Sequence, residues 1–531
     1  MKKGKNAVLF LCILITAFMM AACGKQGAVE LPTVNEIEGE QPETAQEEEV
    51  KEAEEENEDK TEKEETTGEL ELSFVTKDVF HEEGEDAYVM LSTLTYDMLD
   101  TISLPGYEAC EASMKAYFAE YEEQLLAADR DYAADAKKKF EAQTESDTWY
   151  GPSQTASIRI QRVDERVVSV SEEYYLYAGN GDYSDPTGYS TAANFDTGTG
   201  KLLTLADIAS DEDAFKAAVE ELAGTPLKDD GWALTNCGFL VFTHDMSWGN
   251  YGSEFPSYLI DYDELSQFFN EKYLPTLEEY TFYFEEGQEV LLDLDEDGTK
   301  EKISLIASGT DDVESETFGN YLLSVNDEEV LIAEYAYSAD AYVIKHKDGT
   351  AGFMVNTYFE GDYTALHPVA YMDGNLKEYD EMSGRIDRNT VKPDSLVAES
   401  SLDVLGTWGA IMSYNITEDY HLVSSTGEFL LENEKGYRWR REIVTAKELP
   451  VYHEDGSDSG EILPVGTVLY PIRTDAVTYM IAEKEDGTAV MIKLNKVKET
   501  EIYDGETYEY YYYQIDDEAA DDYFEPLPYA G

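Results

Sequence analysis

The sequence predicts an α+β domain near the N-terminus followed by mostly β domains, and three observations lead to this fold class. Residues 109–143 have helical composition and lie between segments with the alternating pattern of strands. Runs rich in β-branched and aromatic residues follow this segment. Beyond residue 280, short apolar segments are separated by Asp-Gly pairs, which suit hairpin turns that require a positive φ. At 531 residues the chain has room for several domains of about 100 to 200 residues each.

The first residues have the features of a secretory signal. Lysines precede an apolar run, Ala7 to Met20, that is shorter than a membrane span of about 20 residues, and Ala21 and Ala22 lie directly before Cys23. Bacterial lipoprotein signals resemble this pattern, with cleavage before a cysteine that receives a diacylglycerol. We therefore expect residues 1–22 to be removed and Cys23 to anchor the protein at the extracytoplasmic face of the membrane. An ordinary secretory signal with an incidental cysteine is the alternative.

Residues 23–70 are expected to form the lipid anchor and a disordered acidic tether. This segment holds runs of glutamate, few large apolar side chains and two prolines. Such a composition buries too little apolar surface to offset the entropy lost on ordering. A glutamate-rich helix is the less favoured alternative, because adjacent like charges destabilise helices.

Residues 71–275 are predicted to form the α+β domain. Within residues 109–143, the apolar side chains Met114, Phe118 and Leu125 are spaced for one face of a helix. A second helix is expected at residues 206–222. Strands are expected at residues 157–162, 167–177, 190–196, 239–242 and 258–260.

The second half of the chain is predicted to be mostly β. Residues 276–442 form a β-rich region. In residues 443–516, the segments 449–452, 462–467 and 490–494 follow an order that resembles bacterial SH3-like domains, which implies a small barrel at the end of the fold. The tyrosines at 508 and 510–513 suit its last strand, with stacking on carbohydrate or peptide as the alternative. Residues 517–531 are expected to form a loose tail.

Two blocks of the first domain carry a resemblance to a known family. Residues 190–207, with the sequence Ser-Thr-Ala-Ala-Asn-Phe-Asp-Thr-Gly-Thr-Gly-Lys-Leu-Leu-Thr-Leu-Ala-Asp, form the first block, and residues 239–265 form the second. Both resemble the extracellular domain of the lysozyme-responsive anti-sigma factors and the accessory domain of some peptidoglycan deacetylases, a DUF3298-like domain. The resemblance implies a sensing or binding role outside the cell, with lysozyme or peptidoglycan as the partner. A lipid anchor in place of a membrane-spanning helix implies that no sigma factor is sequestered.

The charge of the chain indicates which classes of partner to expect. The chain has 114 acidic and 38 basic residues, a formal net charge of −76, which argues against nucleic acid because phosphate contacts need Lys and Arg. Cationic partners are favoured, although the acidity could equally serve solubility.

Besides Cys12 and Cys23, the chain holds Cys110 and Cys237, which could form a disulfide in an exported protein. Two buried free thiols are the slightly favoured alternative.

Residues 293–301, Asp-Leu-Asp-Glu-Asp-Gly-Thr-Lys-Glu, form the sharpest local motif. Asp293, Asp295 and Asp297 alternate as Ca²⁺ ligands do, Gly298 suits the tight turn, and the Thr299 carbonyl is a further candidate ligand. Flanking strand-like segments favour an acidic calcium loop between two strands, with Glu301 as a fifth ligand. An acidic hairpin turn without metal is weighed equally.

No pattern in the sequence specifies a catalytic reaction. A Gly-x-Ser-x-Gly elbow, a His-Glu-x-x-His motif and a Walker loop are all absent, and the six histidines are scattered along the sequence. We therefore favour a membrane-anchored binding lipoprotein for envelope polymer or for a cationic protein such as lysozyme. An enzyme that modifies cell-wall glycan or peptidoglycan, and a structural envelope lipoprotein, are the alternatives.

Overall fold

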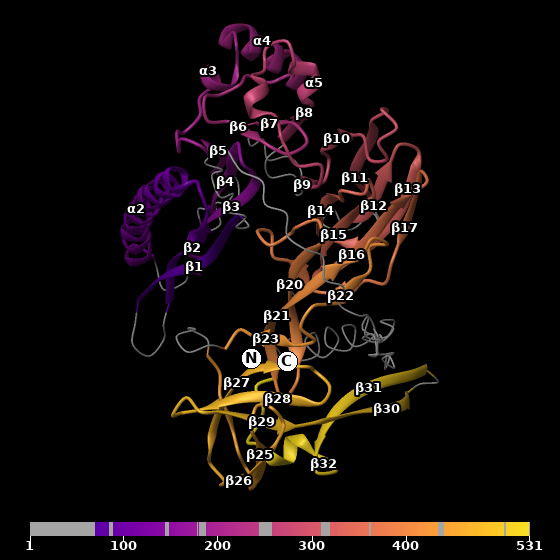
Figure 1. Cartoon of the computed structure of the whole chain (residues 1–531). Coiled ribbons are helices and arrows are strands. Elements are labelled where there is room, and N and C mark those ends of the chain that lie inside the picture. Colours follow the sequence, from indigo (N-terminus) through magenta and orange to yellow (C-terminus); the bar gives the residue numbers. More distant parts are fainter. Residues whose placement is uncertain are drawn as a thin grey trace, which may run out of the picture. The chain divides into compact units, whose positions relative to one another are not determined.

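The computed structural model describes residues 70–83, 89–143, 148–177, 179, 187–243, 257–309, 319–360, 363–433, 440–503 and 506–529. Cys23 and the expected signal lie outside these residues, as does the expected tether up to residue 69. The chain forms two compact units. The larger consists of Thr66–Leu402 and Trp408–Glu432, and the smaller includes Asp403–Thr407 and Asn433–Gly531. The fold is mostly β, with its long helix near the start of the described chain (Figure 1).

The larger unit begins with a five-stranded sheet and a long helix. Its strands lie in the order β1 (Glu71–Glu83), β2 (Val89–Ser103), β3 (Ser153–Val163), β4 (Val167–Tyr177) and β5 (Thr187–Asp196). Helix α2 (Glu108–Glu141) connects β2 to β3, so these two strands are parallel while the other neighbours are antiparallel. The helix confirms the prediction for residues 109–143, and Met114, Phe118 and Leu125 pack into the core beneath it.

The sheet is split between β2 and β3. Their register pairs Thr93–Tyr96 with Ser153–Ala156, and beyond these residues β4 is the strand partner of β3 within the described chain. The Asp97 carboxylate enters the split, where its Oδ2 accepts a hydrogen bond of 2.9 Å from the Ile158 N–H. The last part of β3 therefore has one edge that no other strand of the described chain covers.

A small helical layer follows the sheet. The expected helix at residues 206–222 is in fact two helices, α3 (Leu205–Ile208) and α4 (Glu212–Ala223). The interruption arises because Asp211 begins α4 as its N-cap and accepts a hydrogen bond from the Ala214 N–H. These helices share a core with β6 (Trp232–Leu234), β7 (Phe239–Phe242), β8 (Ser257–Ile260), α5 (Tyr262–Leu265) and the 3-10 helix η2 (Glu271–Tyr273).

Two further sheets of the larger unit pack on one core. The first has the order β10 (Glu289–Leu292), β11 (Glu301–Gly309), β12 (Gly319–Val325), β13 (Glu328–Ala336). The second has the order β17 (Asn375–Glu378), β16 (Thr364–Met372), β15 (Ala351–Tyr358), β14 (Ser338–Lys345), β9 (Tyr280–Glu285), with β18 (Met382–Ser383) beside β16. Ile303 and Leu323 from the first sheet meet Phe353 and Val355 from the second. The short strands β19 (Arg385–Ile386), β22 (Leu422–Ser424) and β23 (Phe429–Leu431) and the longer β20 (Ser395–Asp403) and β21 (Thr407–Ile416) follow.

The smaller unit is built from short strands, as expected for residues 443–516. One group has the order β27 (Val468–Thr474), β28 (Tyr479–Lys484), β29 (Ala489–Lys493), β25 (Leu449–Tyr452), β26 (Asp458–Leu463), with β24 (Ile443–Val444) beside β27. The other consists of β30 (Asn495–Tyr503), β31 (Glu506–Ile515) and β32 (Glu518–Ala519), so the tyrosines at 508 and 510–513 lie on a strand.

The expectation of a loose tail after residue 516 is wrong for its first part. The 3-10 helix η4 (Ala520–Tyr523) leads into Phe524, which is 4% exposed and forms a bridge with Thr445. The Ala446 N–H also donates to the Tyr523 carbonyl, at 2.7 Å. The first part of the tail packs because its aromatic side chains Tyr523 and Phe524 are buried. The sequence does not predict this packing, because the neighbouring acidic residues and prolines are typical of an exposed segment.

Candidate functional site

The acidic loop of residues 293–300 connects β10 to β11. Leu292 and Glu301 form the register pair that closes this hairpin. Within the loop, Glu296 has a φ of 61° and Gly298 a φ of 84°, so the backbone turns back through two left-handed residues. The prediction of a hairpin turn at Gly298 is confirmed.

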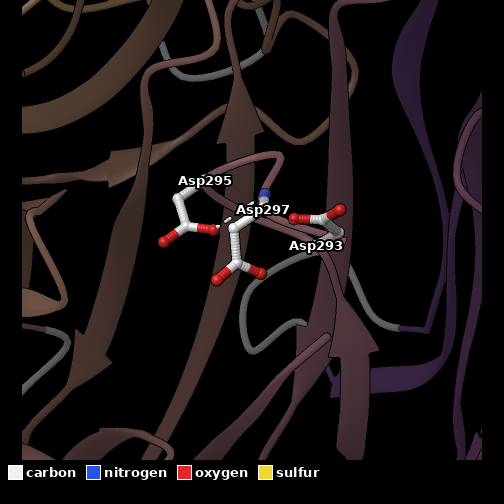
Figure 2. A group of neighbouring side chains, drawn as sticks. All are labelled: Asp293, Asp295 and Asp297. Carbon is white, nitrogen blue, oxygen red and sulfur yellow. Dashed lines mark hydrogen bonds between the residues drawn. The ribbon is translucent and has the colours of Figure 1, made fainter. Parts of the chain in front are cut away.

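The turn brings the three aspartates of the loop together (Figure 2). Asp293, Asp295 and Asp297 each place one carboxylate oxygen within 4.8 Å of those of the other two. Loop N–H groups orient the side chains: Asp297 N donates to Asp295 Oδ1 at 3.2 Å, Gly298 N to Asp293 Oδ2 at 3.0 Å, and Thr299 N to Asp297 Oδ1 at 2.7 Å. Each aspartate thus has a second oxygen outside these loop bonds.

The spacing of the aspartates suits a hard cation. Oxygen ligands lie about 2.3–2.6 Å from Ca²⁺, so two ligands on opposite sides of one ion are about 5 Å apart. Asp293 Oδ1 is buried and has no hydrogen-bond partner among the described residues. A buried carboxylate oxygen without a partner is costly, and a bound cation would satisfy it.

Glu301 lies at the base of the loop, outside the group formed by the three aspartates. Its side chain is 4% exposed, and Oε2 accepts a hydrogen bond of 2.8 Å from the Leu294 N–H. Burial raises the pKa of Glu301, and the charges of Asp295 and Asp293 raise it further. Through this hydrogen bond to the Leu294 N–H, Glu301 holds the start of the loop in place. Thr299 is exposed, and its N–H is engaged by Asp297.

Lys345 of β14 binds the backbone of the acidic loop. Its side chain is 4% exposed, and Nζ donates to the Leu294 carbonyl at 2.5 Å and to the Gly349 carbonyl at 3.2 Å. The same ammonium lies 3.5 Å from Glu296 Oε1. Lys345 therefore fixes the loop backbone and offsets part of its negative charge. The sequence gives no sign of this role, because 51 residues separate Lys345 from Leu294.

A second candidate site is an open pocket of about 1040 Å³ in the larger unit, here called the β3 pocket. The start of β1 (residues 70–73) and Thr101 of β2 form one wall, and residues 160–165 at the end of β3 form another. Residues 276–281 and 388–397 contribute most of the remaining lining. The pocket therefore lies at the split between β2 and β3.

Asn389 binds the uncovered edge of β3 at this split. Its Nδ2 donates to the Ile158 carbonyl at 2.9 Å, and the Ile160 N–H donates to its Oδ1 at 3.3 Å. A side-chain amide thus occupies the place that a peptide group of a neighbouring strand would take. Since 231 residues separate Asn389 from Ile158, the sequence offers no local signal for this contact.

The two arginines of β3 have structural roles in the pocket wall. The guanidinium carbon of Arg159 lies 3.2 Å from the ring centroid of Tyr283, and Nη1 donates to Tyr342 Oη at 3.0 Å. Arg162 donates through Nε to Asp164 Oδ2 at 2.7 Å and through Nη1 to the Tyr273 carbonyl at 2.7 Å. Both arginines are buried, so they hold the strand in place.

Cys110 and Cys237 are free cysteines in this structure. Cys110 lies in the first turn of α2 and faces the core, where burial raises its thiol pKa to about 11. Cys237 lies beside Thr235, and burial raises its pKa to about 12. Neither thiol is activated as a nucleophile, because the reactive thiolate is disfavoured at both positions.

Comparisons of the chain with known proteins find matches among solved structures. No protein-family model and no curated protein matches it. A DUF3298 family protein from Pseudomonas aeruginosa PAO1 is similar in structure, with a TM-score of 0.28 and 15% identity over 40% of this chain and 99% of that chain. A DUF3298 family member from Bacteroides fragilis gives a TM-score of 0.28 and 14% identity over 38% and 94%, respectively. Within the described part of this chain, no helix is both long and apolar enough to cross a membrane.

Proposed function

We propose that the protein is a non-catalytic binding protein of the cell envelope and that the acidic loop binds Ca²⁺. The observation that carries the calcium site is that Asp293, Asp295 and Asp297 each place one carboxylate oxygen within 4.8 Å of those of the other two. The partnerless buried Oδ1 of Asp293 adds support, because a cation would complete its coordination. With three carboxylates and an open hairpin, the affinity belongs to the weak extracellular range of about 10⁻⁴ to 10⁻³ M.

Calcium should stabilise the fold through this loop. Thermal unfolding is measured with and without calcium at about 10 mM, with ionic strength matched by NaCl. A ligand at about ten times its Kd adds roughly 1.4 kcal/mol of stability, which raises the melting temperature by a few degrees. Asp295→Asn should remove most of this increase. The control Asp486→Asn alters an exposed Asp-Gly turn of the smaller unit and should keep it. No increase for the wild-type protein, or an equal increase in Asp295→Asn, would contradict the calcium site.

A cationic protein is the second proposed ligand, and the net charge of −76 is the observation that favours it. The lipid proposed for Cys23 would hold this charge at the membrane surface, and the SH3-like fold proposed for residues 443–516 would add a second module. Lysozyme is the partner that the family resemblance suggests. Electrostatic attraction should speed association, so raising salt from about 0.05 to 0.5 M should lower the association rate at least tenfold. Surface plasmon resonance measures this directly, and absence of a complex at physiological salt would exclude lysozyme.

A further inference from the structure

We propose that the β3 pocket binds an extended, cationic segment of a polypeptide partner, whose backbone pairs with the uncovered edge of β3. This inference rests on the proposed binding of a cationic protein and assigns a site to it. The addition of a strand to a free sheet edge supplies main-chain hydrogen bonds, while side pockets supply specificity. The proposal follows from the backbone of the split, the lining of the pocket and the charge at its rim.

The backbone of β3 is available for pairing at this edge. On one side, residues 157–160, Arg162 and Val163 pair with β4, with a register shift at Gln161, and on the other side the pairing with β2 ends at Ala156. Two side chains bond the backbone of β3 where the pairing with β2 ends: Asp97 accepts from the Ile158 N–H, and Asn389 bonds the Ile158 carbonyl and the Ile160 N–H. A peptide segment that follows the edge of β3 beyond Asn389 would extend the pairing toward Val163, which lines the pocket.

The lining offers contacts for the side chains of such a segment. Ile160 and Val163 on β3 and Leu72 on β1 are half-buried, and Leu277 is 44% exposed. Burial of these apolar surfaces would favour binding, at about 25 cal/mol for each Å² removed from water. Backbone pairing does not depend on the sequence of the bound segment, and the apolar lining can contact some of its side chains. Both features suit a polypeptide ligand.

The exposed charges at the rim are mainly acidic. The lining residues with an exposed acidic side chain are Glu71, Glu165, Glu279 and Asp394, and those with an exposed basic side chain are Arg388 and Lys392. The buried arginines of the wall are engaged with Asp164 and with tyrosines, so they do not attract an anion. This rim, on a chain with a net charge of −76, complements a cationic segment.

The test uses a fluorescein-labelled peptide of about ten residues in which lysine and valine alternate, titrated at about 0.15 M salt. Glu165→Lys/Glu279→Lys reverses two charges at the rim. Glu328→Lys/Glu329→Lys makes the same change in net charge on β13, outside the pocket. The rim variant should bind about tenfold more weakly than wild type, while the β13 variant should change less than about threefold. Equal losses in the two variants would overturn the assignment to the pocket.

A second arm tests backbone pairing with the wild-type protein. Two further peptides carry N-methyl groups on the lysine or on the valine nitrogens, which removes alternate N–H donors but keeps the charge. At least one of them should bind about tenfold or more weakly than the unmethylated peptide, and equal binding of all three would overturn the inference. Lysozyme binding is measured in parallel. If lysozyme binds but the unmethylated peptide does not, the pocket is excluded while the proposed cationic partner stands.

Discussion

Glu172 of β4 lies beneath α2 with 4% of its surface exposed. Tyr117 Oη donates to its Oε1 at 2.7 Å, and the Thr191 hydroxyl lies 3.5 Å from Oε2. Burial raises the pKa of Glu172 from 4.5 to about 7, although both hydrogen bonds lower it. Between these two values the folded protein holds a proton that the unfolded chain has released. Stability from this residue therefore falls as the pH rises through this window.

Glu172→Gln should remove this pH dependence and keep the hydrogen bond from Tyr117. Between about pH 4.5 and 7.5, the free energy of unfolding of the wild-type protein should fall relative to that of the variant by roughly 3 kcal/mol. Urea denaturation at several pH values measures the difference, with the exposed Glu328→Gln as the control. Parallel pH profiles of wild type and Glu172→Gln would show that the carboxyl is not protonated in the folded state.

At the scale of elements, the hairpin β10–β11 depends on the left-handed backbone of Gly298. A Cβ at this position would meet no atom within 4 Å. The cost of a side chain would therefore come from the backbone, because residues other than glycine rarely adopt a φ of 84°. Gly298→Ala should destabilise the loop by about 1 kcal/mol and weaken calcium binding several-fold. Gly309→Ala at the end of β11 is the matched control, because its Cβ is equally free and its φ lies outside the left-handed region. Calcium affinities that are equal in the two variants would contradict the role of this turn.

The elements differ in how far the sequence predicts them. Helix α2 was predictable because the spacing of Met114, Phe118 and Leu125 is a local pattern, and the acidic loop was predictable because its three aspartates lie within five residues of sequence. The sequence does not predict the division between α3 and α4. A single N-cap residue, Asp211, is a weaker sequence signal than the helical composition of the residues on both sides of it. The β3 pocket was not predictable, since Asn389 and Ile158 are brought together by the fold alone.

For the whole molecule, the net charge of −76 makes electrostatic repulsion the dominant long-range effect on stability. At about 0.15 M salt, charges more than about 8 Å apart are largely screened, so added salt should relieve this repulsion. The melting temperature should therefore rise by several degrees when NaCl is raised from about 0.01 to 0.5 M. Differential scanning calorimetry measures this change. A melting temperature that falls with salt would mean that attractive ion pairs outweigh the repulsion.

The three aspartates of the acidic loop are proposed to form one calcium site. Isothermal titration calorimetry of the wild-type protein and of Asp293→Asn/Asp295→Asn with CaCl₂, up to several millimolar, tests it most directly. The double variant removes two of the three carboxylates and leaves the loop glycine and Lys345 unchanged. The wild-type chain should bind one calcium ion with a Kd of about 10⁻⁴ to 10⁻³ M, and the variant should bind none at this site. The same binding curve for both proteins would contradict it.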